Sequence, residues 1–65
     1  MKYFDYETVG REAKIPSDKM KKLVQLMREE FPNDPLMCEL HVLRACMAIR
    51  DGQVNVEDAV KNKAQ

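Results

Sequence analysis

The stretch LMCELHVLRACMAIR, residues 36–50, decides the fold because it is apolar on two opposite sides at once. At about 100° per residue, residues four and three positions apart line up along one side of a helix. One such stripe consists of Leu36, Leu40, Leu43 and Met47. A second stripe, roughly opposite the first, consists of Cys38, Val42, Ala45 and Ile49. A helix that is apolar on two sides belongs inside a structure, so we expect these stripes to be contact seams with neighbouring helices.

Length and composition indicate one small domain over residues 1–65, near the size at which a core barely sustains itself. Eleven basic residues balance eleven acidic ones, so no net charge attracts nucleic acid or an anionic membrane. There is no apolar run long enough for a signal-peptide core or a membrane span. Cys38 and Cys46 would lie about 12 Å apart along one helix, too far for a disulfide. We therefore expect a cytoplasmic protein without membrane attachment.

The first half of the chain predicts two helices. Asp5 is a suitable N-cap for a helix that starts at Tyr6 and ends before Pro16. Gly10 inside this helix suggests close contact with a neighbouring backbone. Ser17 is expected to cap a second helix that runs to about residue 31. Its buried face is predicted from the helical spacing of Met20, Leu23, Val24, Met27 and Phe31.

The second half predicts two more helices. Asp34 is the expected N-cap of the central helix, about residues 35–51, and Gly52 can take the left-handed position after it. Asn55 is expected to cap a short last helix that ends near residue 62. The predicted fold is all-α: a compact four-helix single domain whose central helix is packed on both sides. The second helix would cover one stripe, and the first and fourth would share the other.

The first and fourth helices are short, so one stripe of the central helix could stay partly uncovered. Pairing with a second copy would cover it, and twofold pairing is the commonest form of association. We therefore expect a homodimer. Binding of a different protein partner is the alternative way to cover the stripe.

Groups that carry chemistry are scarce. Cys38, His41 and Cys46 are the soft metal ligands of the central helix, but a structural zinc site needs four ligands, usually in two clusters. We interpret them as core cysteines and a boundary histidine. With one histidine, no Gly-rich phosphate loop and no paired carboxylates in an apolar setting, we expect no catalytic residues, metal or cofactor.

Residues 8–27, TVGREAKIPSDKMKKLVQLM, contain a second pattern. Its apolar or small positions are Val9, Gly10, Ala13, Ile15, Met20 and Leu23. This pattern resembles the generic helix-turn-helix of many bacterial regulators, which implies that the second helix enters the major groove. The resemblance places Ser17, Asp18, Lys21 and Lys22 toward the bases, and Lys14 and Lys19 near phosphates. Lys14 stands where the motif usually has glycine, and no arginine is placed for bidentate guanine contact.

Residues 39–60 are also similar to the paired helices that follow the wing in MerR-type regulators. The connector over residues 32–35 is too short for the wing hairpin of that family. Two hypotheses therefore stand. The first is a non-enzymatic interaction module that self-associates or holds a partner's helix in a groove. The alternative is a helix-turn-helix DNA-binding protein that uses residues 8–27.

Overall fold

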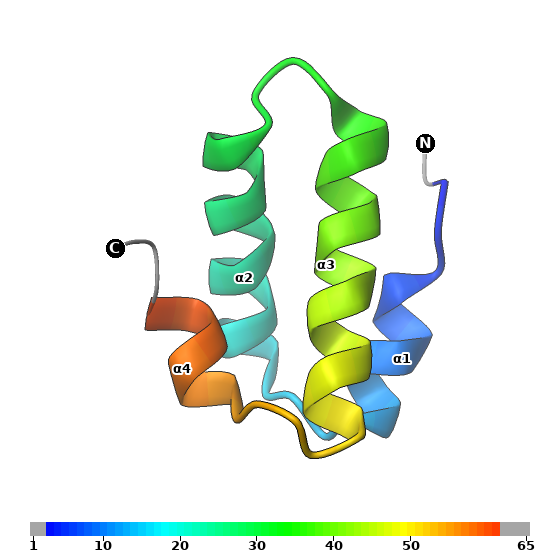
Figure 1. The fold of residues 1–65 in the computed structure, drawn as a ribbon, viewed down its shortest axis with the longest axis vertical. Helices are drawn as coiled ribbons and strands as arrows, with labels where there is room; N and C mark the ends of the chain where they lie inside the picture. Colours follow the sequence, from blue (N-terminus) through cyan, green and yellow to red (C-terminus); the bar gives the residue numbers. More distant parts are fainter. Residues whose placement is uncertain (1–2, 62–65) are drawn as a thin grey trace.

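The computed structural model describes residues 3–61, and this part of the chain folds into four α-helices without strands. They are α1 (Tyr6–Glu12), α2 (Ser17–Glu30), α3 (Pro35–Arg50) and α4 (Val56–Lys61). The long helices α2 and α3 run side by side in opposite directions, with α1 beside α3 and α4 beside the lower end of α2 (Figure 1). The prediction of a small all-α domain is confirmed. No helix within residues 3–61 combines the length and apolarity that a membrane crossing requires.

Three helices begin as their capping residues predict. The side chains of Asp5, Asp34 and Asn55 each accept a hydrogen bond from the backbone N–H three residues on, at 3.2, 3.1 and 3.3 Å respectively. Each bond satisfies one of the donors that the first turn of a helix leaves unpaired. At the other end of α3, Gly52 takes φ +79°, so the predicted left-handed position after this helix is also confirmed.

The start of α2 differs from the prediction. Ser17 is the first helical residue rather than the cap, and Pro16 holds the cap position without a side-chain hydrogen bond. The reason is that Pro16 has extended backbone angles, φ −61° and ψ 150°, directly before the helix. The backbone N–H groups at this end of α2 therefore donate no hydrogen bond to a cap side chain.

The core lies where α1, α2 and α3 meet. Leu23, Val42 and Cys46 are fully buried there. Half-buried apolar residues surround them, namely Tyr6, Val9, Ile15, Met20, Val24, Met27, Ala45, Ala59 and Val60. Gly10 is buried as well, and its close neighbours are the side chains of Met20 and Cys46 rather than the backbone that was expected.

The two sides of α3 are covered unequally. α3 packs against both α1 and α2, whereas α4 packs against α2 instead of sharing a stripe of α3 with α1. Of the second stripe, Cys38 and Val42 are buried, and Ala45 and Ile49 are half-buried. Because α4 is engaged elsewhere, the stripe that begins at Leu36 is left only partly covered.

Candidate protein–protein interface

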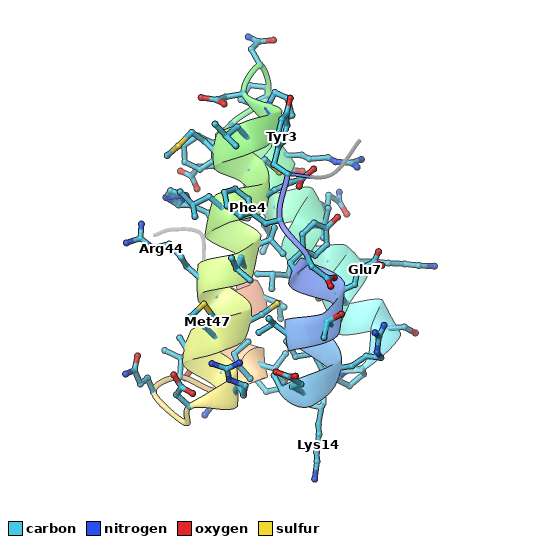
Figure 2. The ribbon with its side chains drawn as sticks, turned by 90° about the vertical axis from the view of Figure 1, so that its right-hand side faces the viewer. Tyr3, Phe4, Glu7, Lys14, Arg44 and Met47 are labelled. Carbon is cyan, nitrogen blue, oxygen red and sulfur yellow. The ribbon has the colours of Figure 1, made fainter. Side chains whose placement is uncertain are left out.

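The partly covered side of α3 carries the first stripe, Leu36, Leu40, Leu43 and Met47, which we call the outer stripe. Leu36 is 45% exposed and Met47 is 39% exposed, while the two leucines between them are half-buried. Figure 2 shows Met47 on the face of α3 that looks away from α2. A single exposed apolar residue is ordinary, but here two of them lie on the same side of one helix.

The N-terminal segment lies beside this stripe. The backbone N–H groups of Tyr3 and Phe4 donate hydrogen bonds to Oε1 of Glu39 on α3, at 2.6 and 3.1 Å. Tyr3 is 52% exposed and Phe4 is half-buried, and both lie along α3 on the side that carries Met47 (Figure 2). Sequence patterns did not reveal this attachment, because Glu39 lies 36 positions after Tyr3 and 35 positions after Phe4 in the chain.

In the second stripe, by contrast, Cys38 and Val42 are buried. Cys38 and Cys46 are free, buried thiols, as the sequence predicted for core cysteines. Burial raises the pKa of Cys46 to about 11, and burial also raises the pKa of Cys38, with the charge of Arg28 acting in the opposite direction. A thiol that stays protonated at neutral pH is a weak nucleophile, so both act as small apolar side chains.

The side chain of His41 packs against neighbouring residues of the domain. Its ring lies 4.7 Å from that of Phe31, centroid to centroid and tilted by 40°, and its Nδ1 is 3.3 Å from the carbonyl oxygen of Met37. The ring contact joins the first half of α3 to the residue that follows α2, and the contact with Met37 lies within α3. Across residues 3–61 no three His, Cys, Asp or Glu side chains gather closely enough to share a metal ion.

The corner between α1 and α2 turns at Lys14. Lys14 takes φ +61°, the left-handed conformation for which glycine is usual at this turn. The N–H of Lys14 donates to the carbonyl of Arg11 at 3.0 Å, and that of Ile15 donates to Gly10 at 3.1 Å. All six apolar or small positions of the pattern are buried or half-buried.

The predicted DNA-facing residues are mostly accessible. Those that are exposed are Lys14, Ser17, Asp18, Lys21 and Lys22. Lys19 differs, because it is half-buried and its Nζ lies 3.9 Å from Oε1 of Glu57 on α4. An open groove of about 530 Å³ separates α1 from α2 and is lined by Arg11, Lys21 and Arg28 around an apolar floor.

No family model, curated protein or solved structure matches the chain. Function is therefore inferred from two surfaces, the outer stripe of α3 and the exposed half of α2. Of the other predicted seam residues, Cys38 and Val42 are buried within the domain, whereas Ala45 and Ile49 are half-buried.

Proposed function

We propose that the protein is a non-enzymatic helical interaction module that self-associates through the outer stripe of α3. The observation that carries this proposal is the joint exposure of Leu36 and Met47 at the two ends of a stripe whose middle is half-buried. Only three side chains of the domain's described residues are fully buried, so the hydrophobic core of one copy is small. A second copy would extend that core, and we propose a homodimer as the functional form.

The affinity of such a pair can be bounded. Complete burial of a Leu or Met side chain contributes about 1.5–3 kcal/mol, and the two end residues are already more than half covered. Each therefore has about 1 kcal/mol left to contribute, and a twofold interface uses each residue twice. Part of this gain is offset by the loss of translational and rotational freedom. We expect a dimer that dissociates on dilution.

The stripe is tested with two glutamate variants at similarly exposed apolar positions. Met47→Glu places a charge in the outer stripe, whereas Val54→Glu, at a residue 42% exposed, places one in the connector before α4. Sedimentation equilibrium is expected to show a dimer for the unaltered chain and Val54→Glu, and a monomer for Met47→Glu. Circular dichroism should show the same helix content in all three. Equal association of the two variants would contradict the proposal.

DNA binding through the first half of α2 is the second candidate function. It is favoured by Lys14, which adopts the left-handed turn conformation that the helix-turn-helix corner needs although it is not glycine. Lys14, Lys21 and Lys22 are exposed around that corner and could contact phosphates. Lys19 is a weaker candidate because of its ion pair with Glu57.

This second candidate is tested by adding a short arbitrary duplex to isotope-labelled protein in low salt. If it is right, backbone amide shifts will move at residues 17–22 and return as salt is added, because phosphate contacts release counterions. The double variant Lys21→Glu/Lys22→Glu should show no such movement. Unmoved shifts in the unaltered protein at high concentration would exclude this function.

A further inference from the structure

The outer stripe has the spacing of a coiled-coil seam. In a heptad written abcdefg, the 4-3-4 steps place Leu36 and Leu43 at d positions and Leu40 and Met47 at a positions. This register fixes the positions that flank the seam. Glu39 falls at g on one side, and Arg44 falls at e of the next heptad on the other side.

The two flanking charges distinguish the possible orientations of a second copy. In a parallel pair, the g side of each helix runs along the e side of the other, so Glu39 meets the second copy's Arg44, five positions on. In an antiparallel pair, g sides meet g sides and e sides meet e sides. With position 36 opposite position 47, that arrangement puts Glu39 and the second copy's Arg44 on opposite sides of the seam, so the attractive pair is lost.

Both charges are positioned for such a contact. The N–H groups of Tyr3 and Phe4 both bond to Oε1 of Glu39, which holds the carboxylate beside the stripe and leaves Oε2 without a bond among the described residues. Arg44 is exposed, extends away from α3 (Figure 2), and takes part in none of the ion pairs within residues 3–61. Arg50, by contrast, is engaged by Glu12 at 3.1 Å.

We propose that two copies bind in parallel and in register through α3, with the twofold axis along the helices and Glu39 of each copy paired with Arg44 of the other. This proposal rests on the self-association proposed above and specifies its geometry. Leu36 then faces Leu36 of the second copy, and Met47 faces Met47. The two N-terminal segments lie at the same end of the dimer.

Cysteine cross-linking tests the orientation. The native thiols are buried, so a cysteine placed in the stripe is the accessible one. In a parallel dimer, Leu36→Cys brings two thiols into the same layer, and mild oxidation should link them nearly completely. In an antiparallel dimer, position 36 faces position 47, and the two are about 16 Å apart along one helix. A mixture of Leu36→Cys and Met47→Cys chains, resolved by mass spectrometry, is therefore expected to give 36–36 and 47–47 links.

A predominance of 36–47 links would overturn the parallel register while leaving self-association intact. A dimer that cross-links at neither position would overturn both the register and the use of the outer stripe. A monomeric mass for the unaltered chain at all concentrations would contradict the proposed function itself. The three failures are thus distinguishable.

Charge reversal provides a second test. Arg44→Glu turns two attractive pairs of a parallel dimer into two repulsive ones, so we expect the dissociation constant to rise about tenfold. In an antiparallel dimer Arg44 has no acidic partner across the seam, so the same variant should change the constant little. Arg44→Lys keeps the charge and is the matched control, with affinity close to that of the unaltered chain. An unchanged affinity for Arg44→Glu would overturn the pairing.

Discussion

Gly10 of α1 lies directly against the side chain of Met20 of α2. A Cβ atom at position 10 would come within 2.9 Å of Cε and 3.2 Å of Sδ of Met20, and within 3.7 Å of Sγ of Cys46. Sγ of Cys46 is itself 3.8 Å from Sδ of Met20. The three helices therefore meet at one point, and a glycine in the middle of a short helix is what permits their approach.

The first prediction concerns this contact. Gly10→Leu should lower the free energy of unfolding by about 1–3 kcal/mol, because the added atoms displace Met20 and Cys46 in a packed core. Gly10→Ala should be close to neutral, since its gain in helix propensity of about 1 kcal/mol offsets a shift of the flexible end of Met20. Urea unfolding followed by circular dichroism measures both. A Leu variant as stable as the Ala variant would show that this junction is loosely packed.

The second prediction concerns the turn before α2. Lys14 holds φ +61°, which costs a residue with a Cβ atom about 1–2 kcal/mol. Lys14→Gly should therefore raise the free energy of unfolding by about 1 kcal/mol. Lys14→Ala removes the same charge without relieving the backbone, so its stability should stay near that of the unaltered chain. If thermal unfolding shows equal effects for the two, the left-handed turn does not contribute the strain described here.

The helices themselves could be predicted from the sequence because their signals are local. Asp5, Asp34 and Asn55 act within three residues of their own positions, and each forms the expected cap. Ser17 failed as a cap because Pro16 took the position before the helix. In each case the deciding interaction lies within one turn of the chain.

The surface could be predicted only in part, because coverage depends on long-range packing. The periodicity of α3 identified both stripes, yet it could not show that α4 packs on α2 and leaves Leu36 and Met47 exposed. The bonds from Tyr3 and Phe4 to Glu39 likewise have no local signal.

The third prediction concerns the start of α3. The Asp34 carboxylate accepts the N–H of Met37 at 3.1 Å, so Asp34→Ala should destabilise the protein by about 1 kcal/mol. Asp34→Asn keeps a side-chain oxygen that can accept this hydrogen bond, so its free energy of unfolding should fall far less. Chemical denaturation of the two variants gives the comparison, and equal losses would mean that charge rather than the cap bond accounts for the effect.

The fourth prediction concerns alkaline pH. Burial raises the pKa of Cys46 from 9.0 to about 11 in the folded state, so the unfolded chain loses the proton first as pH rises. The buried, protonated thiol of Cys46 therefore makes its full contribution to the free energy of unfolding below pH 9. That contribution is lost between pH 9 and about 11, at up to about 1.4 kcal/mol per pH unit. Cys46→Ala should show a flatter decline over that window. Unfolding free energies measured at several pH values test this, and parallel curves for the two proteins would refute it.

The fifth prediction, the mass of the unaltered chain in solution, tests the central claim most directly. Light scattering over a dilution series, from the high to the low micromolar range, should show twice the 7.6 kDa of one chain at the concentrated end, falling toward that value on dilution. A mass of 7.6 kDa throughout would mean that the outer stripe of α3 stays open to water and would contradict self-association.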